Sequence, residues 1–427
     1  MSTKNILVVY GAFLYPLRST TRDHLFCFKR YSGHRCFYLN MVPLGRKPFR
    51  DVPSFLRKVP FDLIVFHTDL LGLQYPSHST EQFIEKAEVL RNIPAVKVVL
   101  AQDEHFNPNA IAKFINDFGI DHVFSLAPES EWKKIYPTVD LNKVKFYRTL
   151  PGYLDEKTLK KISKLQRKIP RKDIDIGYRA YGVRYHLGRH GFLKIKIADV
   201  FNQKTVNERL KVDISTRTGD IIYGDKWYEF LLRCKYTIAV EGGATVLDPD
   251  GKIMPKSLEF IKTHPGARFE DVENACFPGL DGQIQYMAIS PKHLEACATR
   301  SCQILIEGEY NGILKPGIHY IELKKDFGNI DDVLDIVRKD ELREEIVEKA
   351  YREIASTSKY TYNRYVEFIL EKCLKKAPDP MTEKKRWPVR LLYLFSLMFE
   401  GFTWCKLVLY CLLSRALRSL KTWLNKR

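Results

Sequence analysis

Residues 96–125 read VKVVLAQDEHFNPNAIAKFINDFGIDHVFS and contain the pattern that decides the fold. The run Val96–Leu100 is apolar and β-branched, which favours a buried strand. Helix-forming residues follow over Ala110–Asn116, and a second apolar run occupies His122–Ser125. A strand, a helix and another strand in this order predict two parallel strands joined by a crossover helix.

The same alternation extends in both directions from this unit. In the first part of the chain a helix is expected at Glu81–Leu90, and further strands at Ile6–Val9, Arg35–Leu39, Asp62–Phe66 and Val144–Tyr147. A basic, helix-prone segment, Glu156–Lys172, then interrupts the pattern. Strands are expected again at Asp173–Ile176, Val212–Ile214, Thr237–Val240, Ile304–Ile306 and Tyr320–Leu323, with helices near 190–202, 225–233, 291–300 and 331–355.

Two successive units of this kind predict an α/β chain with two Rossmann-like domains that face a cleft. We expect the first domain over residues 1–170 and the second over residues 171–358. A helix over 359–378 is expected to cross the domain junction. A helical, basic and hydrophobic tail follows over 379–427.

The composition of the 427 residues is 45% hydrophobic and 12% aromatic, as expected for a folded chain of two domains. The formal net charge of +18 predicts an anionic partner. Residues 384–427 contain ten lysines and arginines and one acidic residue, Glu400. Their net charge is therefore +9, which is half of the net charge of the whole chain. A nucleic-acid groove is more often built into the folded body, and no nucleic-acid partner is expected.

Nine cysteines are scattered without a CxxC pair or a metal-ligand spacing. An odd number without a framework indicates reduced thiols and a cytosolic location. The apolar run at residues 6–17 is interpreted as a buried first strand rather than a signal-peptide core, because no small-x-small cleavage site follows it.

Three stretches of the second domain read IDIGYRAYGVRYHLGRHGFLKIKIADVF (174–201), VDISTRTGDIIYGDKWYEFLLRCKYTIAVEGGATVLDPDG (212–251) and SPKHLEACATRSCQILIEGEYNGILKPGIHYIELKK (290–325). They resemble the bacterial glycosyltransferases of the group 1 type, and the CgeB-like branch in particular. The stretches occur in the order that this family shows, and the similarity covers roughly residues 170–370.

The resemblance implies the GT-B architecture, with a first domain that binds the acceptor and a second that binds a nucleotide-sugar. It implies no cofactor besides this co-substrate and no bound metal, because a helix dipole and basic side chains neutralise the leaving diphosphate. The family's E-x7-E pair would place its first glutamate at position 287, where this chain has Met287. This departure leaves the donor sugar open.

Ser290 and Pro291 precede an apolar-periodic segment and predict a helix start with a serine side-chain cap. Free amides at such an N-terminus suit a diphosphate, and Lys292 would add a full positive charge. Glu295 is three residues further on and lies on the same helix face. The resemblance assigns the donor's ribose hydroxyls to Glu295, and the alternative is a Lys292–Glu295 pair on a solvated face.

Glu241, Gly242 and Gly243 directly follow an expected strand. Glycines at the carboxyl end of a strand let the backbone approach a ligand closely, so these residues are candidates for the donor site, although a plain tight turn fits as well. The D-x-D of Asp248 and Asp250 lies beside proline and glycine and is interpreted as a turn rather than a metal site.

Arg179, Arg184 and Arg189 gather around the first strand of the second domain. Arginine matches phosphate oxygens in a two-pronged geometry, so Arg179 and Arg184 are candidates for donor binding, with surface charge as the alternative. His186 and His190 have i,i+4 spacing, but no third ligand accompanies them and no zinc site is expected.

Catalytic candidates are expected in the first domain, where strands end at the cleft. Asp103 and Glu104 follow the strand Val96–Leu100, and a carboxylate there can take the acceptor's proton or stabilise an oxocarbenium ion. His24 in the segment 16–24 is a further candidate, with an ordinary surface helix as the alternative.

The tail segment Leu391–Leu413 is long enough to cross a bilayer but contains Glu400 and Lys406. Basic residues flank it about equally, so nothing orients a span. We therefore expect one or two interfacial helices, broken near Gly401, whose basic residues meet anionic lipid. A true span and a partner-binding or dimerising helix are the alternatives.

Sequence and resemblance together predict a metal-independent transferase of the hexosyltransferase type, cytoplasmic and peripheral on the inner face of the membrane. Its expected partners are a nucleotide-sugar donor and a surface polysaccharide, a lipopolysaccharide or another glycan or lipid-linked acceptor. One alternative is a nucleotide-sugar epimerase of the same fold, which needs no lipid anchor. The other is a non-catalytic nucleotide-sugar-binding protein, which the loss at Met287 favours.

Overall fold

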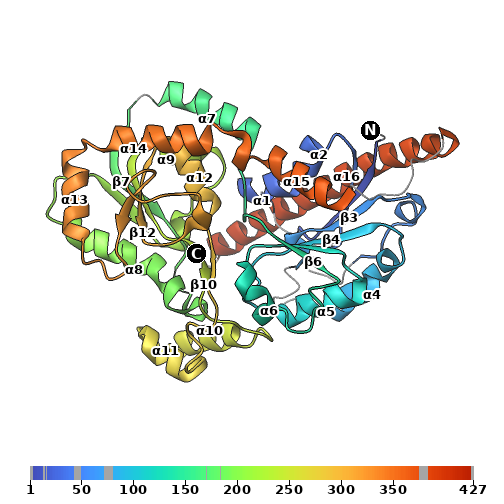
Figure 1. The fold of residues 1–427 in the computed structure, drawn as a ribbon, viewed down its shortest axis with the longest axis horizontal. Helices are drawn as coiled ribbons and strands as arrows, with labels where there is room; N and C mark the ends of the chain where they lie inside the picture. Colours follow the sequence, from blue (N-terminus) through green and yellow to red (C-terminus); the bar gives the residue numbers. More distant parts are fainter. Residues whose placement is uncertain are drawn as a thin grey trace.

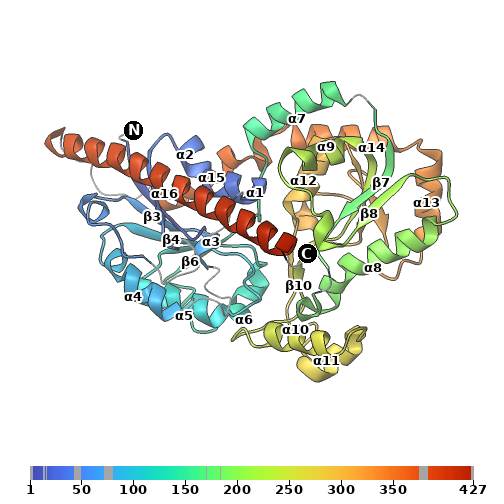
Figure 2. The same cartoon turned by 180° about the vertical axis from the view of Figure 1, so that it is seen from behind.

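The computed structural model describes residues 3–12, 15, 17–42, 50–71, 80–169, 171–182, 184–374 and 383–424. These residues form two α/β domains that lie beside each other and a long C-terminal helix, α16 (Glu383–Leu424), against the first domain (Figure 1). Figure 2 shows α16 crossing the first domain towards its junction with the second. The expected fold class, two Rossmann-like domains that face a cleft, is confirmed by the sheets described next.

The first domain is built on a six-stranded parallel sheet with the order β2-β1-β3-β4-β5-β6. Its strands are β1 (Asn5–Tyr10), β2 (Arg35–Asn40), β3 (Leu63–Phe66), β4 (Val96–Leu100), β5 (His122–Ser125) and β6 (Lys145–Arg148). Its helices are α1 (Ser19–Leu25), α2 (Cys27–Tyr31), α3 (Thr68–Leu71), α4 (Thr80–Arg91), α5 (Pro108–Phe118) and α6 (Trp132–Ile135). All six expected strands are confirmed, and the order reverses between β1 and β3.

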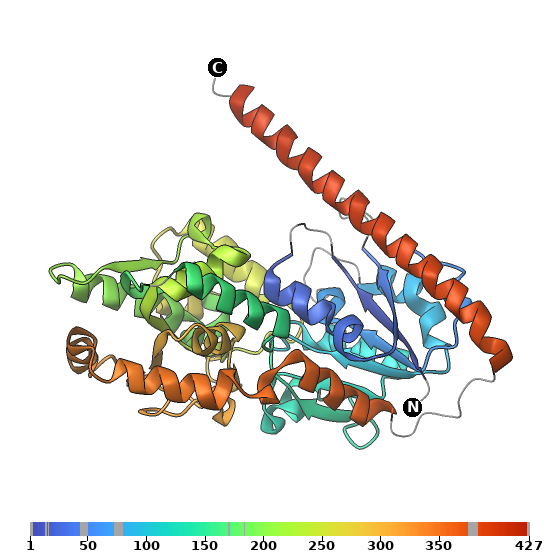
Figure 3. The ribbon, with the colours of Figure 1, turned by 90° about the horizontal axis from the view of Figure 1, so that it is seen from above.

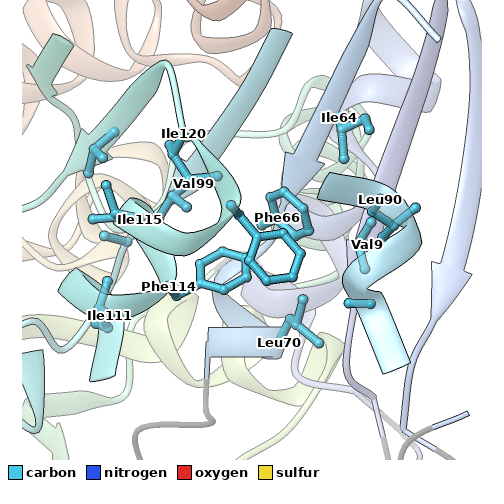
Figure 4. Close-up of a cluster of buried hydrophobic side chains, with 14 of the residues drawn as sticks. Val9, Ile64, Phe66, Leu70, Leu90, Val99, Ile111, Phe114, Ile115 and Ile120 are labelled. Carbon is cyan, nitrogen blue, oxygen red and sulfur yellow. The ribbon is translucent and has the colours of Figure 1, made fainter. Parts of the chain in front are cut away.

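Side chains of these strands enter two cores, because successive residues of a strand point to opposite faces of the sheet. On one face Val9 and Phe66 pack towards α4 and α5, where the rings of Phe66 and Phe114 meet edge to face at 4.9 Å (Figure 4). On the other face Val8 and Val65 pack with residues of α2 and of the helix α15 (Tyr362–Leu374). Helices cover both faces, which explains the near-continuous apolar strands.

The second domain repeats this plan with a five-stranded parallel sheet of order β13-β12-β9-β7-β8. Its strands are β7 (Ile174–Arg179), β8 (Val212–Ser215), β9 (Cys234–Ala239), β12 (Cys302–Ile306) and β13 (Ile321–Leu323). Its helices include α8 (Gly188–Thr205), α9 (Asp225–Arg233), α12 (Pro291–Ala298), α13 (Ile330–Lys339) and α14 (Arg343–Ala350). All five expected strands are confirmed, and the order reverses between β7 and β9.

A lobe between β9 and α12 was not expected from the sequence. The short strands β10 (Gly242–Ala244) and β11 (Tyr286–Ala288) pair antiparallel and enclose the helices α10 (Ile253–Thr263) and α11 (Phe269–Cys276). Asp248 accepts hydrogen bonds from the amides of Lys252 and Ile253 at 2.8 and 2.9 Å. The turn interpretation of Asp248 is therefore confirmed, because its carboxylate holds the chain at the start of α10.

Two helices cross between the domains. The helix α7 (Glu156–Lys168) precedes the boundary expected at residue 170, yet Ile162 packs with Tyr228 and Leu232 of the second domain. The helix α15 returns to the first domain through Tyr365 and other apolar residues, as a crossover helix should. Residues 375–378 of the expected crossover segment lie outside the described residues.

The tail forms one continuous helix along β2, the edge strand of the first sheet. The expected break near Gly401 is wrong, since the helix runs through this residue. A single glycine costs a helix about 1 kcal/mol, and packing on both sides of Gly401 against the first domain offsets that cost.

Candidate active site

A cavity of about 470 Å³ lies between the two domains, at the carboxyl ends of their strands. The segments after β1 and β4 line it from the first domain, and those after β7 and β9 line it from the second. Both sheets reverse their strand order beside these segments, which is where ligands bind in open parallel sheets. Among the described residues, its lining includes Arg18, Asp103, Arg179, Arg184, Lys194, Trp227, Gly242, Gly243, Ser290, Lys292 and Glu295.

The start of α12 faces this cavity. The helix begins at Pro291 as expected, but the side chain of Ser290 makes no capping hydrogen bond, so the expected serine cap is wrong. The Ser290 hydroxyl is instead buried at the cleft and has no hydrogen-bond partner among the described residues. An unpaired buried hydroxyl costs free energy unless a ligand satisfies it.

Lys292 reaches the same cavity two residues later. Its ammonium group lies 5.0 Å from the ring centroid of Tyr178. Burial, together with the nearby charge of Lys194, lowers the pKa of Lys292 to about 7. The site therefore holds a cation that a bound anion would stabilise.

Lys194 is a cleft residue that sequence reasoning missed. It lies on α8, where burial and the charge of Arg184 lower its pKa, while Asp103 across the cleft acts in the opposite direction. Leu187, Gly191 and Lys194 all line the cavity at spacings of four and three residues. Residues at these spacings lie on one face of a helix, so this pattern in the sequence could have predicted that Lys194 faces the cleft.

The three candidate arginines have different positions. Arg184 lies in the cavity with its guanidinium 5.2 Å from the ring centroid of Tyr181, and Arg18 of the first domain lies 4.8 Å from the same ring. Arg179 also lines the cavity, but it is ion-paired with Asp213 at 2.7 Å and donates to three backbone carbonyls. The contacts of Arg179 show a structural role, whereas Arg184 and Arg18 lie beside Tyr181, which also lines the cavity.

Arg189 lies outside the cavity, in ion pairs with Glu270, Glu273 and Asp281 of the inserted lobe. His186 lines the cavity, whereas His190 shares a 3.2 Å hydrogen bond with the carbonyl of Glu241. Among the described residues, no group of three or more His, Cys, Asp or Glu side chains is placed to hold a metal ion.

Glu295 lines the cavity and is only 7% exposed, so the alternative of a solvated Lys292–Glu295 pair is wrong. Its Oε2 accepts a hydrogen bond from Trp227 at 2.7 Å, and its Oε1 accepts a long one from the Tyr228 hydroxyl at 3.4 Å. Burial raises the pKa of Glu295 to about 7 against the opposing effect of these two donors.

The segment Glu241–Gly243 divides between the cavity and the core. Gly242 and Gly243 line the cavity, and a side chain on Gly243 would overlap with the backbone oxygen of Tyr286. The carboxylate of Glu241 instead accepts the amides of Glu309 and Tyr310 at 3.2 and 2.6 Å, which anchors the loop after β12. The expectation that Glu241 contacts a ligand is therefore wrong for its side chain.

Asp103 lines the cavity from the first domain and adopts a positive φ of 52°. The inserted lobe of the second domain holds the loop that follows it. The amide of Asn107 donates to the carbonyl of Asp248 at 2.7 Å, and the amide of Asp248 donates to the carbonyl of His105 at 2.8 Å. The position of Asp103 thus depends on contacts between the domains.

Glu104 and His24 do not face the cavity, and the expectation that they do is wrong. Glu104 is fully buried in the first domain, where Ser125, Tyr136 and the amides that follow β5 donate to its carboxylate. His24 shares a 2.8 Å hydrogen bond with His67, and burial lowers its pKa to about 4. Both side chains are therefore buried within the first domain.

No protein-family model matches the chain, and no curated protein matches its sequence. Among solved structures it is similar to Anabaena HepE in complex with UDP-glucose, at 10% sequence identity and a TM-score of 0.48. That match covers 86% of this chain and 100% of HepE. The chain is also similar to a glycosyltransferase from Rickettsia africae, at 12% identity, a TM-score of 0.48, and 88% and 100% coverage of this chain and that one. Sucrose-phosphate synthase from Thermosynechococcus elongatus gives 8% identity, a TM-score of 0.49, and 86% and 98% coverage.

Proposed function

We propose that this chain is a glycosyltransferase that moves a sugar from a nucleoside diphosphate sugar to a glycan or lipid-linked acceptor. The observation that carries the proposal is the convergence of Arg184, Lys194 and Lys292 with the unpaired Ser290 hydroxyl at the start of α12. Both lysines have lowered pKa values because they are buried near like charge. A diphosphate supplies the negative charge that this wall of the cleft lacks.

The reaction needs negative charge to be stabilised as it develops on the leaving diphosphate. Lys292, Lys194 and Arg184 would do so together with the free amides of α12, without a bound metal. Glu295 would accept a ribose hydroxyl through Oε1, since Trp227 holds Oε2. Asp103 on the opposite wall would take the proton of the acceptor hydroxyl.

Surface polysaccharides, lipopolysaccharide and other glycoconjugates are the acceptors we propose. Their glycan ends present hydroxyl groups, and a base such as Asp103 would take the proton of one of them. A cleft that opens to solvent between two domains would admit such a polymer end.

Thermal unfolding with a panel of nucleoside diphosphates and their sugars tests donor binding, because a ligand at 100 times its Kd adds about 2.7 kcal/mol to stability. We expect one base to stabilise the chain, Lys194→Met to remove most of that effect, and Lys204→Met on the same helix to preserve it. Lys204 is an exposed control that pairs with Asp331. No stabilisation by any nucleotide would refute the proposal.

Transfer is tested with a labelled donor and glycan acceptors. We expect activity to persist in excess chelator, and loss of activity with recovery on added Mn²⁺ or Mg²⁺ would refute metal independence. Binding of a donor without turnover on any acceptor would instead indicate a non-catalytic binding protein. Conversion of the free donor to its epimer would indicate an epimerase.

A further inference from the structure

An ordinary surface helix buries its apolar side and exposes its polar side. The helix α16 instead exposes a strongly apolar side to solvent. The side against the first domain is buried and partly polar. Its members are Val389, Ser396, Glu400, Thr403, Leu407 and Cys411. The opposite side is apolar and 55–66% exposed. Its members, called here the outward face, are Leu391, Leu394, Met398, Phe402, Leu409 and Leu413.

Glu400, the acidic residue that interrupts the hydrophobic tail, points towards the protein. Its carboxylate is 3.2 Å from the ammonium group of Lys29, and the residue is 8% exposed. Trp404, one turn later, stacks on Tyr10 with ring centroids 6.3 Å apart. Glu400 and Trp404 therefore contact the first domain. The outward face carries the aliphatic, thioether and phenyl groups of its leucines, Met398 and Phe402.

We propose that the outward face is a docking surface for an anionic lipid bilayer, with α16 lying in the plane of the membrane. A contiguous apolar surface of this kind is rare on soluble monomers. Within residues 384–427 ten basic residues accompany one acid, and that acid is buried against Lys29. This charge distribution complements anionic headgroups while the apolar side chains enter the acyl boundary.

The same charges disfavour a second copy of the chain as the occupant. Two outward faces placed together would bring the basic residues of both tails into one interface, and the acid that could neutralise them points inwards. A lipid surface requires no such approach of like charges.

The helix segment Pro388–Ser414 is long and apolar enough to cross a membrane by length and composition. However, this segment is also the part that packs on the first domain, from Val389 to Cys411. A span would detach it and expose Ser396, Thr403 and Glu400 to lipid. Figure 3 shows α16 lying beside the first domain and extending past it at its C-terminal end.

Cys405 supplies the probe, because it is the one exposed thiol among the nine cysteines, all of which the structure describes. It lies between Phe402 and Leu409 in the sequence of the outward face. A polarity-sensitive fluorophore on Cys405 of the full chain should shift to the blue with phosphatidylcholine–phosphatidylglycerol vesicles, and less with phosphatidylcholine alone. High salt should reverse this shift only in part, because screening leaves the apolar contact.

The double variant Met398→Glu/Phe402→Glu should weaken vesicle binding at least about ten-fold, because it places two charges in the acyl boundary. The matched control is Val206→Glu, an equally apolar and 75% exposed position on the second domain, which should bind vesicles as the unchanged chain does. Both variants change exposed side chains, so their thermal unfolding verifies the fold independently.

Three outcomes would overturn the proposal. The first is an unchanged fluorophore spectrum with both kinds of vesicle. The second is retention in vesicles after alkaline carbonate, with the C-terminus protected from added protease, which would show a span. The third is a blue shift without lipid that depends on protein concentration, which would show a second copy. None of these readouts measures sugar transfer, so they are separate from the proposed activity.

Discussion

The indole Nε1 of Trp227 donates a hydrogen bond to Oε2 of Glu295 across 2.7 Å. Trp227 comes from α9 and Glu295 from α12, and both line the cavity between the domains. The bond fixes the carboxyl group in the wall of the cleft and leaves Oε1 with a long 3.4 Å bond from Tyr228. The protein therefore holds Oε2 firmly and Oε1 only weakly, and Oε1 is the oxygen that we propose accepts a ribose hydroxyl.

Glu295→Gln should change stability in a way that depends on pH. Burial raises the pKa of Glu295 from 4.5 to about 7, so ionising it in the folded state costs about 3 kcal/mol when complete. For an acid with a raised pKa this cost is absent below pH 4.5 and fully present above about pH 7. We expect Glu295→Gln to raise the free energy of unfolding by up to about 3 kcal/mol at pH 8 and by much less at pH 5.

Urea unfolding of both chains at the two pH values measures this difference. Glu259→Gln is the control, because Glu259 is exposed on α10 and should change stability by less than about 0.5 kcal/mol. An equal effect of Glu295→Gln at pH 5 and pH 8 would contradict the raised pKa.

Binding of a nucleoside diphosphate should weaken as the pH rises above 7. The free protein loses the Lys292 proton near pH 7, whereas a bound diphosphate holds that proton and raises the pKa. Affinity should therefore fall by up to about ten-fold per pH unit until the pKa of the complex is reached. Calorimetry in buffers of different ionisation enthalpy should detect proton uptake on binding at pH 8.

Lys292→Met should bind more weakly and lose this pH dependence, and Lys292→Arg should lose the pH dependence while keeping its charge. A pH profile for Lys292→Met that matches the unchanged chain would assign the titration to another group.

Asp103 and Glu104 are adjacent but should respond to substitution in opposite ways. Asp103→Asn should lower kcat by about 10²–10⁴-fold with little change in donor affinity or stability, since its carboxyl group lines the cavity. Glu104→Gln should keep activity in the fraction that folds but lower stability by about 2–4 kcal/mol. An amide cannot accept all the hydrogen bonds that Ser125, Tyr136 and the backbone donate to this carboxylate.

Steady-state kinetics and thermal unfolding of both variants separate the two roles. Full activity of Asp103→Asn would remove it as the base, and loss of activity without loss of stability in Glu104→Gln would place Glu104 in the reaction.

Gly243→Ala should destabilise the second domain by at least about 2 kcal/mol. Gly243 has a φ of 144°, and an added Cβ would overlap with the backbone oxygen of Tyr286 on β11. Gly219→Ala is the matched control, because a Cβ there meets no atom within 4 Å, and it should change stability by less than about 0.5 kcal/mol. Equal unfolding midpoints for the two variants would show that β10 adjusts to a side chain.

Much of the fold could be predicted because its signals are local. The bounds of β4 and β5 agree with the expected strands residue for residue, since each is a short apolar run bounded by helix-forming or turn residues. The inserted lobe was missed because β10 is only three residues of glycine and alanine, and its helices form a small core of their own around Val246 and Phe269. Neither feature produces a clear hydrophobic periodicity in the sequence.

The sequence by itself determined two parallel α/β units and the chemical types available at their strand ends, because burial on both faces of a sheet is recorded in the strands themselves. Only the tertiary structure decided which of those side chains meet. Asp103 faces the cleft and Glu104 the core because the chain turns through a positive φ at Asp103. Glu400 faces Lys29 of the first domain, 371 residues away in sequence, and a contact over that separation leaves no trace in the local pattern of either segment.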